Sequence, residues 1–448
     1  MKLKSYPKYK DSGIKWIGEI PEGWEAHRIK SFVPYIKNGQ WGDDSSGGNK
    51  DFIVLRVADF LEFNFNLNKE LTIRNIKDTK LRLKEGDLVI EKSGGGEKQI
   101  VGRVVQLKNS SKEKKYTYSN FIGKLEISHR MNNTFLNYYF KAFYNNRVNF
   151  NYIKQTTGIQ NLDSESLIQR EYFAYPIDKN YQKSIVSFLD KKIAEIDELI
   201  KKDKKLIELL KEKRSALINY AVTKGLPVLR TQIGFNPNAN MKDSGIDWIG
   251  EIPEGWEVHK MKYNIYEKKI KDTAKNPSTK FIGLEHIESE TGKLISSSTL
   301  EEIDGESIRF KENNVLFGKL RPYLAKVIIT DFQGSCTGEL IVYETGEKID
   351  PKFLFYRLLS KSFINLVTST TYGVKMPRAD PTQLGNIKIA WPSLTEQIAI
   401  AIFLDKFTAR VNNTIQKIQR KINFLEEYKK SLIHHTVTGK IDIREVKI

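Results

Sequence analysis

The chain has 448 residues, more than one ordinary hydrophobic core accommodates and enough for roughly two or three domains. Lys and Arg number 73 against 55 Asp and Glu, a formal net charge of +18 that favours a polyanionic partner. The alternative is a basic surface that only promotes solubility. The single cysteine, Cys336, excludes an internal disulfide and a cysteine-based zinc site and fits a reducing cytoplasm. The longest apolar run, Ile398–Leu404, is far shorter than the roughly 20 residues that span a bilayer, so we expect a cytoplasmic protein without a membrane partner.

One segment occurs twice in the chain. Lys10–Glu25 reads KDSGIKWIGEIPEGWE, and Lys242–Glu257 reads KDSGIDWIGEIPEGWE. Such a long repeat identifies a tandem of two similar halves. The frequent Gly and Pro residues predict a looped docking segment, with Trp16 and Trp24 as apolar anchors. Whether these tryptophans close a small core or meet a partner stays open at this point.

The first unique region, residues 26–155, is rich in short β-type runs separated by turn-forming clusters. The clearest runs are Asp51–Val57, Asp87–Ile90, Ile100–Gln106 and Phe121–Ile127. Residues 134–149 predict a helix with an aromatic face. The second unique region, residues 258–370, repeats this pattern, and its residues 351–368 match the aromatic helix. Both regions therefore predict α+β domains.

Each half closes with a long heptad pattern, in which apolar residues recur in steps of four and three. In the first half, over Gln182–Ala221, the predicted seam residues are Leu189, Ile193, Ile196, Ile200, Ile207, Leu210 and Leu217. In the second half, over Gln397–Val437, they are Leu404, Val411, Ile415, Ile418, Ile422, Leu425 and Leu432. Two similar halves favour a pseudo-two-fold arrangement, so we expect the two helices to pair as an antiparallel coiled coil. Asp203 and Arg214 occupy two seam slots, and Asp203 either fixes the register or marks a kink.

The expected domain order follows from these patterns. It is residues 1–155 (first repeat and variable domain), 156–225 (first long helix region), 226–241 (linker), 242–370 (second repeat and variable domain) and 371–448 (second long helix region).

This doubled architecture resembles the specificity subunit of type I restriction–modification systems over nearly the whole chain. The resemblance rests on YPKYKDSGIKWIGEIPEGWE at Tyr6–Glu25 with its second copy, and on helices that begin QKSIVSFLDKKIAEID and EQIAIAIFLDKFTARV. Two internal motifs add to it: GDLVIEKSGGG at Gly86–Gly96 and LFGKLRPYLAK at Leu316–Lys326.

The resemblance implies a DNA-recognition subunit that carries no catalysis and no cofactor of its own. Its variable regions would be target recognition domains, each reading half of an interrupted site in double-stranded DNA. The paired helices would set the gap and hold two modification subunits, which bind S-adenosylmethionine and methylate adenine. Restriction subunits would add translocation and cleavage driven by ATP and Mg²⁺.

The sequence lacks the motifs that other functions would need. It has no G-x-x-x-x-G-K-[ST] loop, no Asx/Ser-Pro-Pro-aromatic tetrapeptide of amino-methyltransferases and no H-E-x-x-H. The adjacent His434 and His435 would point to different helix faces, which favours solvated side chains over a metal site. Two alternatives remain: a stand-alone enzyme with an unrecognised site, and a coiled-coil scaffold that binds nucleic acid without sequence preference.

Candidate DNA contacts lie in loops of both variable domains. In the first, the loop Glu91–Arg103 combines glycines, which let the backbone approach a phosphate, with cations and an amide that suits adenine. The candidates in this loop are Lys92, Ser93, Lys98, Gln99 and Arg103, and Gln40 and Trp41, in a separate loop rich in Gly, Asp and Ser, are weaker candidates. The alternative is a flexible hairpin tip.

In the second domain the candidates are Lys319, Arg321, Tyr323, Lys375 and Arg378. Arg321 could read guanine, or it could be structural because Pro322 follows it. Whether the loops around Arg321 and Arg378 both meet DNA, or one only docks its helix, stays open.

Overall fold

The computed structural model describes residues 4–96, 99–155, 158–227, 240–271, 276, 278–302, 306–371, 373 and 375–446. They form two compact units, described separately below. Unit 1 comprises Met1–Lys202 and Arg420–Ile448, and unit 2 comprises Asp203–Gln419. Each unit contains one variable domain and parts of both long helices. Most of the predicted linker, residues 228–239, lies outside the described residues. The predicted α+β class, with two similar β-rich halves, is confirmed.

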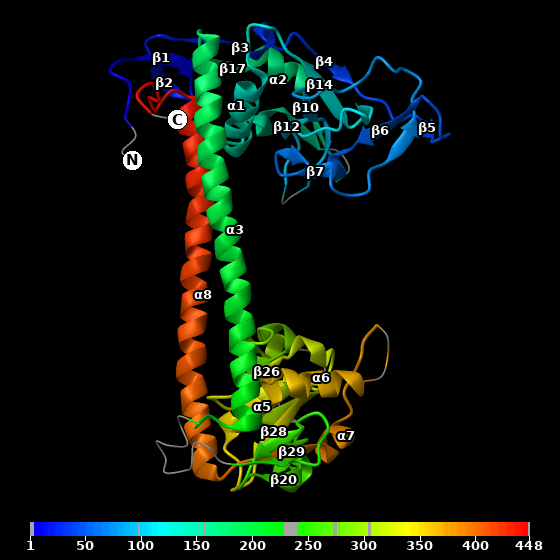
Figure 1. The fold of residues 1–448 in the computed structure, drawn as a ribbon, viewed down its shortest axis with the longest axis vertical. Coiled ribbons are helices and arrows are strands. Elements are labelled where there is room, and N and C mark those ends of the chain that lie inside the picture. The colour runs from blue at the N-terminus through cyan, green and yellow to red at the C-terminus, as the bar shows by residue number, and fades with distance from the viewer. Residues whose placement is uncertain are drawn as a thin grey trace. The chain divides into compact units, whose positions relative to one another are not determined.

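In unit 1 the repeat forms a hairpin, so the prediction of a looped segment is wrong. β1 (Tyr9–Ile14) pairs antiparallel with β2 (Gly18–Pro21). Gly13 and Gly18 have φ values of 68° and 71°. Residues with a side chain rarely adopt such values, so these glycines allow the tight turn between β1 and β2. β3 (Trp24–Arg28) then pairs with β17 (Tyr172–Pro176), and the two lie beside α2 in Figure 1. The repeat therefore uses its glycines to turn between strands.

Unit 2 builds the second repeat in the same way. β18 (Met241–Asp243) pairs with β19 (Glu251–Pro253), and β20 (Glu257–Lys260) pairs with β29 (Lys388–Trp391). Trp24 is 3% exposed in unit 1 and Trp256 is 1% exposed in unit 2. Trp16 packs edge-on against Tyr139 with ring centroids 5.4 Å apart. The tryptophans therefore belong to the cores.

The first variable domain is built from three sheets. The six-stranded sheet has the order β4 (Tyr35–Asn38), β14 (Ile122–Glu126), β10 (Leu88–Glu91), β12 (Val104–Gln106), β8 (Asn64–Phe65) and β7 (Phe60–Leu61). The four-stranded sheet has the order β13 (Tyr116–Tyr118), β6 (Asp51–Leu55), β9 (Ile73–Asn75) and β5 (Asp43–Asp44). A small sheet joins β11 (Ser93–Gly94), β16 (Gln160–Leu162) and β15 (Ile153–Gln155). The larger two sheets enclose a core that includes Leu55, Val89, Val105 and Tyr118.

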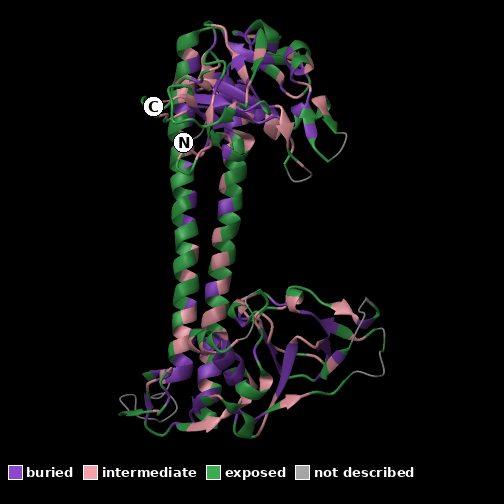
Figure 2. Ribbon diagram, turned by 90° about the vertical axis from the view of Figure 1, so that its right-hand side faces the viewer, coloured by how far each residue is buried: buried purple, intermediate pink, exposed green. Residues whose placement is uncertain are grey.

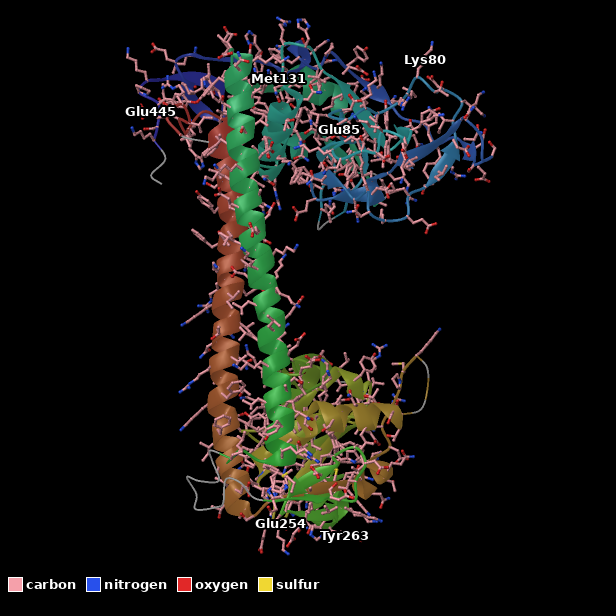
Figure 3. All side chains as sticks on the ribbon, viewed as in Figure 1. Lys80, Glu85, Met131, Glu254, Tyr263 and Glu445 are labelled. Carbon is pink, nitrogen blue, oxygen red and sulfur yellow. The ribbon has the colours of Figure 1, made fainter. Side chains whose placement is uncertain are left out.

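Helices α1 (Asn133–Asn145) and α2 (Ser164–Arg170) complete this domain. The Asn132 side chain caps α1 by accepting a hydrogen bond from the Phe135 amide at 3.0 Å. Glu85, labelled in Figure 3, accepts hydrogen bonds from the amides of Asn109 and Ser110, both at 2.9 Å. These contacts fix the turns that border the sheet.

The variable domain of unit 2 repeats the plan with two four-stranded sheets. One has the order β21 (Ile265–Lys268), β28 (Leu340–Thr345), β25 (Val315–Gly318) and β26 (Val327–Ile329). The other has the order β23 (Ser298–Thr299), β22 (Lys280–Ile282), β27 (Gly334–Thr337) and β24 (Ser307–Phe310). Its helices are α5 (Pro351–Leu359), α6 (Lys361–Ser369) and α7 (Pro381–Asn386). Short 3₁₀ segments occur at Ile29–Ser31, Val57–Asp59, Val148–Tyr152, Met261–Tyr263, Leu284–His286, Leu300–Glu302 and Pro322–Leu324.

The prediction of one helix over residues 351–368 is wrong, because Ser360 separates α5 from α6. Its backbone is extended, with φ −64° and ψ 140°. Its hydroxyl donates to the Arg357 carbonyl at 2.7 Å, a local bond that competes with helix continuation. The amide of Ser362 instead donates to the Asn219 side chain at 3.0 Å, which ties the start of α6 to the first long helix.

The long helices are α3 (Lys179–Lys224, 46 residues) and α8 (Leu394–Val437, 44 residues). None of the predicted seam residues is exposed, and Leu189 and Leu404 are both 0% exposed. Figure 2 shows buried residues recurring along both helices with exposed residues between them. No helix among the described residues is both long enough and apolar enough to cross a membrane.

Contacts inside each unit join the two long helices. In unit 1, Lys429 Nζ of α8 lies 2.7 Å from Asp197 Oδ1 of α3. In unit 2, Arg214 Nη1 donates to Asn412 Oδ1 at 2.5 Å. The later position on α3 thus contacts the earlier position on α8. Asp203 is 8% exposed and lies on the buried side of α3.

Candidate nucleic-acid interface

Each variable domain brings three loop segments together around one lysine. In unit 1 the Lys92 amide donates to the Phe121 carbonyl, and the Lys92 carbonyl accepts from the Leu162 amide, both at 2.8 Å. In unit 2 the Lys319 amide donates to the Glu339 carbonyl at 3.0 Å, and the Lys319 carbonyl accepts from the Ala379 amide at 2.9 Å. We call residues 91–103, 119–121 and 158–161 the first junction, and residues 318–323, 337–339 and 375–378 the second junction.

The glycine loop of the first junction is strapped to the domain. The Gly96 amide donates to the Gln99 carbonyl at 2.8 Å, and the Val101 amide donates to Gln160 Oε1 at 3.1 Å. The Tyr144 hydroxyl donates to the Ile100 carbonyl at 2.8 Å. These bonds oppose the alternative of a flexible tip over the part of the loop that the structure describes. They also explain why the strand predicted over Ile100–Gln106 begins only at Val104. Lys98 lies outside the described residues.

Arg103 does not present its charge at the surface. Its Nε and Nη2 atoms donate to the two carboxylate oxygens of Glu91 at 2.9 and 3.2 Å. Arg103 is 8% exposed and Glu91 is 0% exposed, and the guanidinium lies 5.0 Å from the Phe60 ring centroid. We therefore correct its predicted role: a buried bidentate pair fixes β10 to the segment before β12. With its amide oxygen toward the guanidinium, Gln99 also accepts from Arg103 Nε at 2.8 Å.

The remaining candidates of the first domain are partly engaged by neighbours. Lys92 Nζ donates to the Asn38 side chain, and the Ser93 hydroxyl bonds the Asn161 side chain. Gln40 uses both ends of its amide on the Asp78 backbone, at 2.6 and 3.3 Å. Trp41 is 36% exposed, and the Arg74 guanidinium lies 4.7 Å from its ring centroid. Gln40 therefore positions its loop, whereas Trp41 faces outward.

The second junction unites the candidate segments of unit 2. The Arg321 amide donates to the Pro377 carbonyl at 2.8 Å, and Leu320 forms a β-bridge with Arg378. The loops around Arg321 and Arg378 thus form one surface, although Arg378 also pairs with Glu339 through bonds of 2.9 and 3.2 Å. Its side chain remains 57% exposed.

The backbone gives Arg321 a second role. Its φ of 51° lies in the left-handed region, and Pro322 starts a 3₁₀ turn directly after it. A non-glycine residue in this region costs about 1 kcal/mol or more and usually marks a constrained turn. Arg321 and Lys375 are exposed, and Tyr323 is 48% exposed. Arg321 therefore shapes the junction and also presents its guanidinium.

Several residues that share these surfaces are not among the candidates that the sequence indicates. Phe121 and Ile159 are 52% and 54% exposed in the first junction, and Met376 is 54% exposed in the second. Glu339 occupies the place of Phe121, since the carbonyl of each bonds the junction lysine. The predicted run Phe121–Ile127 places Phe121 at the start of a strand, and aligning the two halves strand by strand would place it in a loop instead.

Each variable domain is docked on a long helix by matching side chains. The fully buried Gln182 of α3 accepts from the Asn132 amide at 2.9 Å and donates to the Pro176 carbonyl at 3.0 Å. Gln397 of α8 does the same with the Asp350 amide and the Pro392 carbonyl, both at 2.9 Å. These contacts anchor the start of α1 and of α5, respectively.

A second pair of matching bonds lies further along each helix. The Tyr138 hydroxyl donates to Asp190 Oδ1 at 2.5 Å, and the Tyr356 hydroxyl donates to Asp405 Oδ1 at 2.7 Å. Burial is the main cause that raises the pKa of both tyrosines. Both hydroxyls therefore stay protonated and act as donors.

The described residues contain no group of three or more His, Cys, Asp or Glu side chains that could hold a metal ion. His434 instead lies 5.9 Å from Trp16 between ring centroids, and its Nδ1 lies 3.1 Å from Asn146 Nδ2. Burial, with smaller contributions from His435 and Lys440, lowers the pKa of His434 to about 4. Its ring is therefore a neutral packing group at pH 7.

Comparisons with known proteins agree on one family. Residues 253–423 match the family described as type I restriction modification DNA specificity domain. The type I restriction enzyme MjaVIII specificity subunit of Methanocaldococcus jannaschii is 25% identical over 467 residues, covering 98% of each chain.

Two solved structures share the fold. One, from work on complex assembly and conformational transition of the type I R-M system, has a TM-score of 0.63 and covers 94% of this chain and 99% of its own. The HsdS subunit from Thermoanaerobacter tengcongensis has a TM-score of 0.52 and covers 94% and 98%. Both are 11% identical to this chain, so the similarity shows a shared fold and no more. The family match over residues 253–423, the full-length relative and the shared fold together make this chain similar to the specificity subunits of type I restriction–modification systems.

Proposed function

We propose that the chain reads an interrupted double-stranded DNA target with two unlike half-sites, one for each variable domain. The observation that carries this proposal is that the two junctions share a backbone framework but not their side chains. Around Lys92 the framework displays Phe121 and Ile159, whereas around Lys319 it displays Glu339 and Met376. One framework with two chemistries suits the reading of two different DNA words.

The docking contacts support a fixed geometry for each domain. Gln182 and Gln397 bond backbone groups on both sides of the joint between domain and helix. Because these groups are buried and paired, a change of angle would break hydrogen bonds. Each domain is thus held firmly on its own helix, as a ruler made of the paired helices would require.

The long helices also offer surface to partner subunits. In unit 2, Leu394, Ile398 and Ile402 recur every fourth residue along α8 and are 42%, 41% and 49% exposed. In unit 1, Phe424 and Tyr428 stack with ring centroids 6.5 Å apart and are 65% and 43% exposed. Apolar stripes of this kind fit the helices of other chains.

We assign these stripes to two modification subunits and to restriction subunits. S-adenosylmethionine would be bound by the modification subunits, and ATP and Mg²⁺ by the restriction subunits. This chain would supply recognition and assembly, and the reactions would take place on its partners.

Co-expression with a modification subunit from the same system, followed by genome-wide mapping of methylated adenine, tests this function. The expected result is an interrupted motif with two unlike halves. Exchanging residues 26–155 for the corresponding region of a relative should change one half and leave the other and the gap unchanged. A methylated motif without a gap, or equal affinity for all duplexes, would instead indicate a scaffold that binds nucleic acid without preference.

A further inference from the structure

An apolar hollow opens at the first junction. Trp41, Phe121 and Ile159, here called the apolar triad, are 36%, 52% and 54% exposed and line one hollow together. Ser93, Gly94, Gly95 and Asn120 contribute to the same lining. The three large side chains come from three separate loops. Such a convergence is unlike the scattered single apolar residues of an ordinary protein surface.

The backbone holds the triad in place. The Gln40 amide donates to the Tyr118 carbonyl at 2.9 Å, which sets the residue before Trp41 against the turn that carries Phe121. Any side chain at Gly39 would collide with the Ser119 carbonyl, so this approach is close. Ile159 precedes Gln160, which is 6% exposed and bonded to the glycine loop. The triad is therefore a preformed surface.

The fold itself does not require apolar groups at these positions. In the second junction Glu339 takes the place of Phe121, because its carbonyl also bonds the junction lysine, and Met376 takes the place of Ile159, because it lies three residues before Ala379 as Ile159 lies three residues before Leu162. A position that accepts both a phenylalanine and a carboxylate is not dictated by core packing. The choice of an exposed aromatic ring at Phe121 therefore points to what the surface contacts.

The charge at the edge of the hollow fits DNA. Arg56 lines it and, together with Lys69, faces the single carboxylate of Asp59, at 3.4 and 2.7 Å. Arg56, Lys69 and Asp59 together carry a net charge of +1, and the residues other than Arg56 that line the hollow are uncharged. A phosphate backbone would complement that charge while base edges meet the triad.

Resting on the proposed function, we propose that the apolar triad contacts the C5-methyl group of thymine and thereby selects an A·T pair in the first half-site. In the major groove each base pair presents hydrogen-bond donors and acceptors, and thymine alone adds an apolar group. The side chains of Trp41, Phe121 and Ile159 carry no polar atom apart from the Trp41 indole nitrogen. Their specificity must therefore come from the methyl group.

The test uses the complex with the modification subunit and duplexes of its mapped target. Each thymine of the first half-site is replaced in turn by uracil, which removes only the C5-methyl. We expect at least one replacement to weaken binding about three- to tenfold, the range for burying one methyl group. Phe121→Ala and Ile159→Ala should weaken binding to the thymine duplex and bind thymine and uracil duplexes equally.

Controls separate the inference about thymine from the proposed function on which it rests. Tyr35→Ala removes another exposed aromatic ring of the same domain, 51% exposed and outside the hollow, and should keep the preference for thymine. Unchanged binding of all uracil duplexes, a half-site without thymine, or a preserved thymine preference in Phe121→Ala would overturn the inference. If the wild-type complex binds thymine and uracil duplexes equally, and Phe121→Ala weakens binding to both by the same factor, the triad stacks on bases and does not recognise the methyl group. A complex with no sequence preference at all would overturn the proposed function itself.

Discussion

At the scale of single residues, the cations of the two junctions divide into those that hold the loops and those that face outward. Arg103 belongs to the first kind, because its Nε and Nη2 atoms donate to the carboxylate of the buried Glu91. Lys319 belongs to the second: its backbone is fixed by Glu339 and Ala379, and its ammonium makes no hydrogen bond or ion pair with any part of the chain that the structure describes. Substitutions at these two residues should therefore affect different properties.

We expect Arg103→Ala to lower the free energy of unfolding by about 3–5 kcal/mol, since it leaves the Glu91 carboxylate buried without its partner. Denaturant unfolding measures this loss. Lys319→Ala is the matched comparison and should leave stability within about 0.5 kcal/mol. It should instead reduce the salt dependence of DNA binding by about one phosphate contact. A stable Arg103→Ala protein with weaker DNA binding would reverse the assignment.

His434 makes unit 1 sensitive to acid. Burial lowers its folded-state pKa to about 4, against about 6.5 in an unfolded chain. Between these values the unfolded state binds more protons, so stability falls as the pH drops through about 6.5 and stops falling near 4. A proton on Nδ1 would also remove the acceptor for Asn146.

We expect this histidine to account for about 1–2 kcal/mol of lost stability between pH 7.5 and 5, because its ring is only partly buried. His434→Phe keeps the ring contact with Trp16 and should flatten the pH dependence of the unfolding free energy by that amount. His435→Gln, at the exposed neighbour, should leave the wild-type slope. Identical slopes in all three proteins would exclude His434 as the source.

At the scale of elements, the joints between the variable domains and the long helices depend on two glutamines. Gln182→Ala would leave the Asn132 amide and the Pro176 carbonyl without partners, and Gln397→Ala would do the same to the Asp350 amide and the Pro392 carbonyl. Each substitution should cost about 2–5 kcal/mol of unfolding free energy. Lys183→Ala, at an exposed residue beside Gln182, should cost almost nothing. Calorimetry of the three variants compares them directly, and equal transition temperatures would refute the role of the joints.

The sequence predicted the long helices well and the loops poorly, for a physical reason. A heptad pattern repeats along α3 and α8, so each turn adds to the same signal, and the observed ends fall within a few residues of the expected ones. The break at Ser360 depends on one hydroxyl bonding a carbonyl, which leaves no periodic trace. The hairpin of the first repeat was likewise missed because its strands are short and rich in glycine.

The sequence indicates candidate loops but not the role of each side chain within them. Of the segments that meet at the two junctions, the sequence points to residues 91–103, 318–323 and 375–378 but not to residues 119–121 or 337–339. However, the pairing of Arg103 with Glu91 requires β10 and the segment before β12 to lie side by side, which a sequence does not state. The hollow lined by Phe121 and Ile159 was equally hidden from sequence reasoning, because their loops are far apart in the chain and meet only in the folded domain.

At the scale of the whole molecule, each unit is completed by the other half of the sequence. In unit 1 the first repeat packs on the segment directly after α8, where the Tyr9 hydroxyl donates to the Lys440 carbonyl at 3.4 Å. The chain end is also tied there, since Glu445, labelled in Figure 3, pairs with Lys4 at 2.6 Å. In unit 2 the second repeat packs on the end of α3, where Lys224 Nζ donates to the Ile249 carbonyl at 3.0 Å. Neither half of the sequence alone contains a complete unit.

The proposed ruler can be lengthened at the boundary of the units. Inserting one heptad between Lys202 and Asp203 and another between Gln419 and Arg420 preserves the seam period and interrupts none of the contacts described within either unit. Seven residues add about 10.5 Å of helix, close to 3 base pairs of DNA.

We expect the doubly extended protein, co-expressed with its modification subunit, to methylate a motif with the same two half-sites and a gap about 3 base pairs longer. Genome-wide mapping of methylated adenine measures both features at once. A heptad in α3 alone lengthens the helix between Asp197 and Arg214 but not the helix between Asn412 and Lys429, so the contacts Asp197–Lys429 and Arg214–Asn412 could not form together, and methylation should fall. An unchanged gap in the doubly extended protein would show that the helices do not set the distance between the half-sites, because the variable domains and their junctions are the same in both proteins.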